Sequence, residues 1–189
     1  VGYLSTLTSN FMVNENSLTG VLPTEIGQLT SFTRMLKLQS NLFTGPVPTE
    51  IGSITAMEAQ LQLHGNALSQ AIPTELGNLD QMVSKFYLYS NALSSAIPTQ
   101  LGKLTGLQSQ IALCGNEFSG TVPTELFKLT RVASLLLEDI PPLSGTIPST
   151  LGNLVYLTNL YWYGSQLSGS LPSELALLTS LTACELTAT

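Results

Sequence analysis

Apolar and polar residues alternate with a period of two in short stretches of this chain, for example Leu36-Lys37-Leu38 and Phe86-Tyr87-Leu88. Such alternation predicts a short β-strand with one face turned inward. The same pattern returns along the chain at intervals of about 25 residues. The chain therefore reads as a series of similar units, each of which contributes one short strand.

Prolines mark the repeat. Seven of them are almost equally spaced, with five intervals of 25 residues and a last one of 24: Pro23, Pro48, Pro73, Pro98, Pro123, Pro148 and Pro172. A period of this size indicates one supersecondary unit stacked on copies of itself. Stacked coils pair their strands into a parallel sheet, and because all connections pass on the outer side, the sheet lines the concave surface of a curved solenoid. We expect one such domain over residues 1–189, with about seven to eight repeats of 24–25 residues.

Other positions of the unit have their own roles. An asparagine follows each strand, where its amide can satisfy turn backbone groups: Asn16, Asn41, Asn66, Asn91 and Asn116. Pro141 and Ser165 take that place later, so we expect an irregularity around residues 140–142. On the outer side, Pro-Thr-Glu-Ile/Leu-Gly predicts a helical turn in which threonine caps the free amides, glutamate favours the positive end and glycine ends the turn.

The repeat resembles the plant-type leucine-rich-repeat family, whose pattern is L-x-x-L-x-L-x-x-N-x-L-x-G-x-I-P-x-x-L-G-x-L. The match covers essentially the whole chain, with copies in register such as NALSQAIPTELGNLDQMVSKFYLYS from Asn66. The resemblance implies an α/β solenoid, a right-handed leucine-rich-repeat superhelix with a parallel β-sheet on its concave face. Short 3-10 helical turns are expected on the convex face.

Composition excludes several classes of function. The net charge is −6 and only 10% of residues are charged, so the chain lacks the basic surface that nucleic acids require. The longest apolar runs are too short to cross a bilayer, and neither end has a signal-peptide pattern, so we expect a soluble chain, mature or trimmed. Cys114 and Cys184 lie three coils apart, too far for a disulfide bond.

Catalytic and metal-binding patterns are absent from the sequence. A catalytic site needs a nucleophile or base beside an orienting partner, and no such set is found. The one histidine, His64, is expected on the concave face as a surface contact, and no Cys/His cluster suits zinc. Cys184 takes a core leucine position. We expect no enzyme activity, no cofactor and no metal.

The strand positions that point away from the core form two columns on the concave face. One runs Met12, Lys37, Gln62, Tyr87, Ala112, Leu136, Tyr161, Glu185, and the other Asn14, Gln39, His64, Tyr89, Cys114, Glu138, Tyr163, Thr187. Four of the six tyrosines fall in these columns, although the repeat requires no particular residue there. Exposed aromatic clusters with a few charges are typical of binding surfaces. Aromatic residues that merely stabilise a sheet surface are the alternative.

The predicted partner-binding patch therefore has six central residues and two at its rim: Tyr87, Tyr89, Tyr161, Tyr163, Leu136 and Glu138, with His64 and Lys85. The partner is a protein or peptide. The resemblance to receptor ectodomains and to secreted inhibitors of wall-degrading enzymes, such as polygalacturonases, implies extracellular recognition in defence or stress. A fragment of a receptor ectodomain is one alternative. Because neither end has a polar cap, end-to-end self-association is a further expectation.

Binding to a regular surface such as ice is the other alternative. Hydroxyl groups form columns along the repeat, the most regular being Thr24, Thr49, Thr74, Thr99, Thr124, Ser149 and Ser173. These columns coincide with capping or turn positions, which also explains their residue type. Curvature is expected to spread the outer columns apart.

Overall fold

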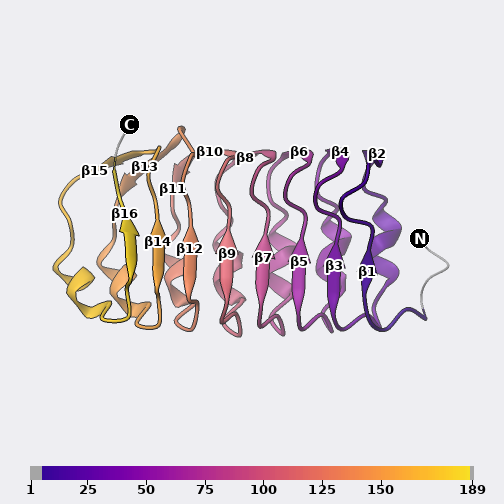
Figure 1. Cartoon of the computed structure of the whole chain (residues 1–189), viewed down its shortest axis with the longest axis horizontal. Coiled ribbons are helices and arrows are strands. Elements are labelled where there is room, and N and C mark those ends of the chain that lie inside the picture. Colours follow the sequence, from indigo (N-terminus) through magenta and orange to yellow (C-terminus); the bar gives the residue numbers. More distant parts are fainter. Residues whose placement is uncertain (1–5, 188–189) are drawn as a thin grey trace.

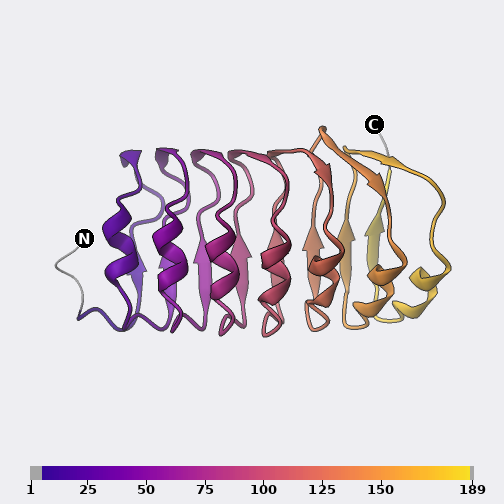
Figure 2. The same cartoon turned by 180° about the vertical axis from the view of Figure 1, so that it is seen from behind.

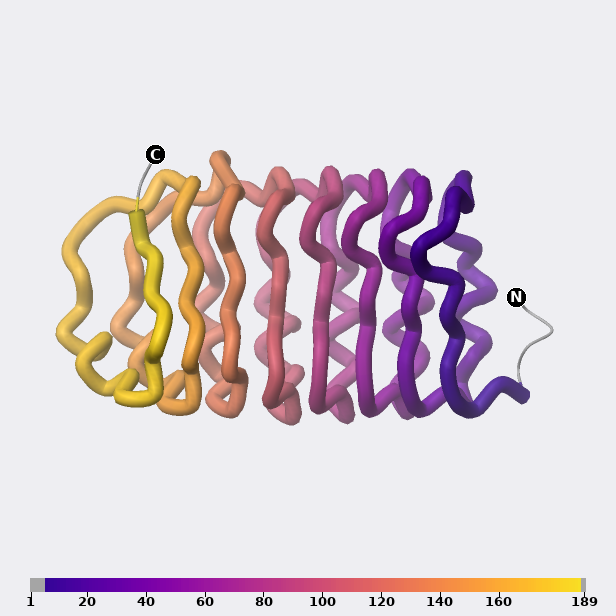
Figure 3. The backbone as a smooth tube through the Cα atoms, viewed as in Figure 1, coloured from indigo at the N-terminus to yellow at the C-terminus, as the bar shows by residue number. Residues whose placement is uncertain are grey.

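The computed structural model describes residues 6–187 and shows a stack of coils that wind in one direction (Figures 1 and 3). Each coil places a short strand on one side of the stack. These strands form a parallel sheet in chain order: β1 (Phe11–Met12), β3 (Met35–Lys37), β5 (Gln60–Gln62), β7 (Lys85–Tyr87), β9 (Gln110–Ala112), β12 (Ser134–Leu136), β14 (Asn159–Tyr161) and β16 (Ala183–Glu185). The predicted solenoid with a parallel sheet is confirmed.

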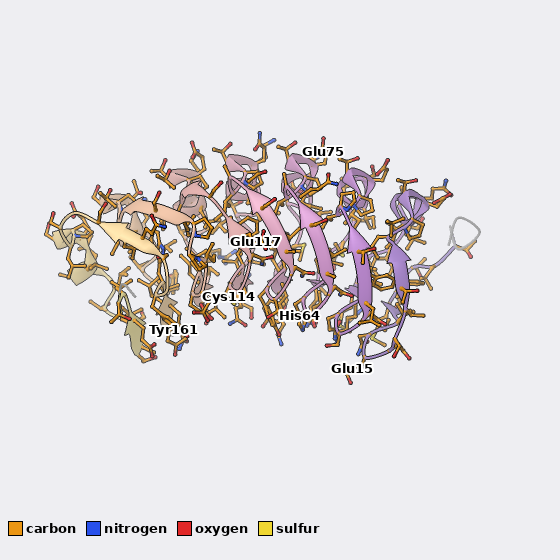
Figure 4. The ribbon with its side chains drawn as sticks, turned by 90° about the horizontal axis from the view of Figure 1, so that it is seen from above. Glu15, His64, Glu75, Cys114, Glu117 and Tyr161 are labelled. Atoms are coloured by element: carbon orange, nitrogen blue, oxygen red, sulfur yellow. The ribbon has the colours of Figure 1, made fainter. Side chains whose placement is uncertain are left out.

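Seven short 3-10 helices occupy the opposite side of the stack in the described residues (Figure 2). They are η1 (Thr24–Gln28), η2 (Thr49–Ser53), η3 (Thr74–Asn78), η4 (Thr99–Lys103), η5 (Thr124–Lys128), η6 (Ser149–Asn153) and η7 (Ser173–Leu177). Seen from above, the helices follow the outer curve and the sheet follows the inner one (Figure 4). The expected division into a convex helical face and a concave sheet is confirmed.

Two further sheets lie along one rim. The first has five strands: β2 (Thr19–Val21), β4 (Leu42–Gly45), β6 (Ala67–Gln70), β8 (Ala92–Ser95) and β10 (Glu117–Phe118). The second has three: β11 (Gly120–Thr121), β13 (Leu143–Thr146) and β15 (Gln166–Ser168). The rim is therefore interrupted between β10 and β11, beside the predicted irregularity at residues 140–142.

The core fills the space between sheet and helices. Each inward strand residue of the middle coils is at most 1% exposed: Leu61, Phe86, Ile111, Leu135 and Leu160. Trp162 is also 1% exposed, as expected for an inward leucine position. Cys184 continues this column next to Leu160 but is exposed, which corrects the expectation that it is buried. No coil among the described residues packs over it, whereas every inner coil is covered on both sides.

The asparagine column stabilises the turns as predicted. Asn116 is buried and donates from Nδ2 to the carbonyls of Leu88 (3.1 Å) and Leu113 (2.9 Å), while its Oδ1 accepts from the Leu93 amide (3.0 Å). Asn41, Asn66 and Asn91 also join their turns to the preceding coil, whereas, within the described residues, Asn16 bonds only the carbonyls of its own turn. Ser165, which replaces asparagine later, is buried with its hydroxyl unpartnered, because its side chain is too short to make the same bonds.

The outer turns differ in detail from the sequence expectation. Proline, not threonine, is the N-cap of each 3-10 helix, and no side chain caps it. Thr49 and Thr74 are the first helical residues, and their hydroxyls bond the carboxylates of the following glutamates. The glycines do not end the turns either. Gly77 is the fourth residue of η3 and faces Gln100 of the next coil so closely that a Cβ atom would lie 2.9 Å from the Cβ of Gln100.

Candidate ligand-binding face

The sheet places the two predicted columns side by side on the concave face. In the first, Tyr87 is in register with Ala112, which pairs with Leu136, which pairs with Tyr161. In the second, main-chain hydrogen bonds such as Ser90 N to Cys114 O (2.9 Å) place each residue beside its counterpart one coil away. Figure 4 shows His64, Cys114 and Tyr161 on the sheet side and Glu75 on the helical side. The predicted columns therefore exist on the concave face, although Gln39, Gln62 and Ala112 within them are buried.

Three rings pack together at the centre of this face. His64 stacks on Tyr89 with ring centroids 4.2 Å apart, and Tyr87 meets both rings edge-on at 5.5 and 5.6 Å. The Lys85 ammonium lies 5.4 Å from the centre of the Tyr87 ring, and the Tyr87 hydroxyl donates to Gln110. These contacts hold the tyrosines in fixed positions, so they present a preformed surface.

His64 is not the exposed side chain that the sequence suggests. It is half-buried, and its Nδ1 atom is shielded from solvent without a hydrogen-bond partner. Burial, followed by the charge of Lys85, lowers its pKa to about 4. His64 is therefore neutral near pH 7 and acts there as an aromatic ring, not as a cation.

A pocket of about 220 Å³ opens beside the rings. Its lining comes from three successive coils: Tyr87, Tyr89, Gln110, Ala112, Cys114, Leu136 and Glu138. Four of the eight predicted patch residues thus share one pocket. Gln110, Ala112 and Cys114 were missed as site residues. The column pattern contained Ala112 and Cys114, but side-chain type gave no reason to select them, because their role is to leave space between larger neighbours.

The carboxylate of Glu138 is the charged group of the pocket. Burial, then the charges of Asp139 and Glu185, raises its pKa, while hydrogen bonds oppose this shift. Burial, followed by the negative charge of Glu138, raises the pKa of the Cys114 thiol to about 12. The thiol is consequently protonated near neutral pH and is a poor nucleophile.

Tyr161 and Tyr163 lie on the far side of the pocket from the ring cluster. Tyr161 is in register with Leu136, and the Tyr163 carbonyl accepts a hydrogen bond from the Asp139 amide at 3.0 Å. Both side chains are partly exposed. The structure therefore places the eight predicted residues on neighbouring coils of one face, although the two pairs of tyrosines are separated by the pocket.

Other kinds of site find no support in residues 6–187. Within that range no three His, Cys, Asp or Glu side chains are grouped so that they could hold a metal ion. The same residues include no helix with the length and apolar character that a membrane crossing requires. Cys114 and Cys184 are free thiols, as their separation in the sequence predicts.

Known proteins agree with this geometry at the level of structure. Neither a protein-family model nor a curated protein sequence matches the chain. Among solved structures, the LRR ectodomain of the receptor kinase GASSHO1/SCHENGEN3 from Arabidopsis thaliana, in complex with CASPARIAN STRIP INTEGRITY FACTOR 2, matches 99% of the chain with a TM-score of 0.89 and 31% identity. The chain is a plant-type leucine-rich-repeat solenoid.

Two more structures define the range of this similarity. The Arabidopsis receptor kinase HAESA, in complex with the peptide hormone IDA and the co-receptor SERK1, matches 100% of the solenoid with a TM-score of 0.86 and 29% identity. A plant ice-binding protein matches 94% of it and 71% of its own chain, with a TM-score of 0.69 and 22% identity, and shares the fold. The solenoid spans 22% of the GASSHO1/SCHENGEN3 chain and 32% of the HAESA chain.

Proposed function

We propose that this leucine-rich-repeat solenoid is a non-catalytic recognition module that binds a peptide, or an extended segment of a protein, along its concave face. The observation that carries the proposal is the fixed cluster of His64, Tyr87 and Tyr89 beside a pocket lined by Leu136 and Glu138. Aromatic anchors next to a pocket are the groups that dominate binding energy in protein interfaces. Such a module acts outside the cell, in hormone perception, defence or stress.

The similar receptors support a peptide as the ligand. The GASSHO1/SCHENGEN3 ectodomain was solved with CASPARIAN STRIP INTEGRITY FACTOR 2, and HAESA with the peptide hormone IDA. A parallel sheet built from many coils offers a long surface on which an extended chain can lie across the strands. If the module inhibits a wall-degrading enzyme, the same concave face would bind a loop of that enzyme.

A random peptide library displayed on phage tests the proposal directly. Peptides that bind the wild-type chain are synthesised, and their affinity is measured by calorimetry for the wild type, Tyr87→Ala and Tyr161→Ala. We expect roughly tenfold or greater weakening in each variant, because aromatic anchors are energetic centres of interfaces. The urea midpoint should stay almost unchanged, since both side chains are partly exposed.

Tyr156→Ala is the matched control. This tyrosine is 64% exposed and lies outside the strands of the concave sheet. It should leave peptide affinity unchanged. Selected peptides that bind Tyr87→Ala and Tyr161→Ala as tightly as the wild type would remove the patch from the binding surface.

Recognition of ice is a second candidate, favoured by one observation. The hydroxyl residue that begins each 3-10 helix is exposed in all seven helices. Against it, several of these hydroxyls already bond the neighbouring glutamate, for example Thr49 to Glu50 at 3.1 Å. Ice recrystallisation assays decide the matter: activity that Thr74→Tyr and Thr99→Tyr abolish would support it, and no activity in the wild type would exclude it.

A further inference from the structure

One oxygen of Glu138 is buried in the pocket wall without a partner. Its Oε2 atom is shielded from solvent and accepts no hydrogen bond, although the side chain as a whole is only half-buried. A carboxylate oxygen that loses water without gaining a partner carries a cost in the folded protein. An unpartnered buried group of this kind calls for an explanation, and carboxylates with perturbed pKa values concentrate at functional sites.

The charged groups around Glu138 do not neutralise it. Asp139 and Glu185 are the charges that influence its pKa, and both are negative. Glu185 lies in register with Tyr161 and, through it, with Leu136, while Asp139 follows Glu138 directly, so the three carboxylates belong to the same end of the stack. Lys85 contacts Tyr87 but is not among the residues that line the pocket. The negative potential favours a cation.

The rest of the pocket suits the apolar stem of a long side chain. Tyr87, Tyr89, Ala112 and Leu136 supply aromatic and aliphatic surface, with Glu138 on the same lining. A volume of about 220 Å³ is smaller than the roughly 300–1,000 Å³ of pockets for drug-sized ligands, so it fits a single side chain. Lysine and arginine pack their methylene stems on apolar surfaces, and their charged heads are attracted to tyrosine faces and carboxylates.

We propose that this pocket binds a lysine or arginine side chain of the ligand, with the charged head on Glu138 and the stem between the two tyrosines and Leu136. The inference rests on the proposed function and specifies which peptides the concave face selects. A neutral side chain of the same length would fill the space but leave the Glu138 carboxylate unpaired. An acidic or phosphorylated residue would be repelled by Glu138, Asp139 and Glu185.

Short peptides test this inference on the intact chain. The probes are acetyl-glycyl-lysyl-glycine amide, its arginine counterpart, and a norleucine counterpart that has the length of lysine without the charge. Each is titrated into isotope-labelled protein while the backbone amide signals of Ala112, Gly115 and Leu136 are followed by NMR. Binding of one side chain should saturate in the range of roughly 1–50 mM. Comparison of the affinities of the lysine and arginine peptides shows which cationic side chain the pocket prefers.

Glu138→Gln is the decisive variant and Glu117→Gln its matched control. Both remove one negative charge, but Glu117 is exposed on β10 at the rim (Figure 4). We expect the cationic peptides to bind at least tenfold more tightly than the norleucine peptide. That preference should disappear in Glu138→Gln and persist in Glu117→Gln. A dispersed amide spectrum confirms that each variant is folded.

Two results would overturn the inference. Equal shifts from the norleucine and lysine peptides would show that charge is not recognised, and no saturable shift from either cationic peptide at about 50 mM would show that the pocket takes neither. Both outcomes leave the proposed function standing if Tyr87→Ala still weakens the library peptides. If the tyrosine variants keep full affinity, the proposed function fails whatever the pocket binds.

Discussion

At the scale of single residues, burial changes what the concave side chains can do. His64 is a possible base by residue type, yet its packing against Tyr89 and the nearby charge of Lys85 keep it neutral near pH 7. Cys114 is a possible nucleophile, yet burial and the Glu138 carboxylate keep it protonated. Both residues therefore contribute contact surface and not reactive groups, which fits recognition better than catalysis.

The His64 environment predicts a specific pH dependence of stability. The unfolded chain protonates His64 below about pH 6.5, whereas the folded chain does so only near pH 4. Because the unfolded state binds more protons in this window, the free energy of unfolding falls as pH falls through it. The contribution is on the order of 1 kcal/mol, since solvent screens the half-exposed ring. Urea unfolding at neutral pH and near pH 4.5 measures it.

His64→Gln isolates this contribution. The variant should lose less stability than the wild type between the two pH values. Glu138 has the opposite sign, because its raised pKa lets the folded state keep a proton as pH rises, but it is present in both proteins and cancels in the comparison. An identical pH dependence of the two proteins would show that His64 titrates normally in the fold.

Residue type and position in the repeat are enough to predict the binding face, but they do not predict the pocket beside the ring cluster. Period-two alternation placed Tyr87 and Tyr161 on the concave face correctly. The partners of His64 and the space above Ala112 depend on side-chain packing between coils, which no single repeat encodes. Cys184 shows the same limit, because its burial depends on a neighbouring coil and not on its own position.

At the scale of elements, glycine sets how closely successive 3-10 helices pack. Gly27, Gly52, Gly77 and Gly102 each face the main chain of the next helix without room for a side chain. In η5 the same position is Phe127, which is fully buried. Helices η5 and η6 accordingly pack less closely than the other neighbouring pairs of the first five coils. The interrupted rim between β10 and β11 lies at the same point of the stack.

Gly77→Ala should destabilise the stack. The added methyl group would overlap the main chain of Gln100, so η3 and η4 would have to move apart. Overpacking of this kind costs about 1–3 kcal/mol. Ala176→Ser is the control, because Ala176 occupies the equivalent position of η7 and is exposed. Equal urea midpoints for Gly77→Ala and the wild type would show that the helices are not held in contact.

The sequence predicts these elements correctly, but its prediction that glycine ends each outer turn is wrong. Proline spacing located the seven outer turns of the described residues, whereas the rim sheet is interrupted between β10 and β11, one coil before the irregularity expected at residues 140–142. The sequence predicts a helix end at glycine because that is the common role of glycine after a helical turn. Contact between coils explains Gly77 instead, and such a contact can be inferred only when two coils are placed together.

At the scale of the whole molecule, the concave face is one continuous sheet with its charges separated along the stack. The first column carries Lys37 near one end and Glu185 at the other, with Tyr87, Leu136 and Tyr161 between them. An extended peptide laid across the strands would meet Lys37 toward one end and Glu138 and Glu185 toward the other. This polarity gives such a ligand a preferred direction.

Mapping a library-selected peptide on the labelled chain by NMR tests the central claim most directly. We predict that its amide shift changes concentrate in β7, β9, β12 and β14 and in the residues that follow them, because these segments carry the aromatic cluster and the pocket. Helices η3 to η6 should change little. Shift changes centred on those helices, with the concave strands unaffected, would contradict the account.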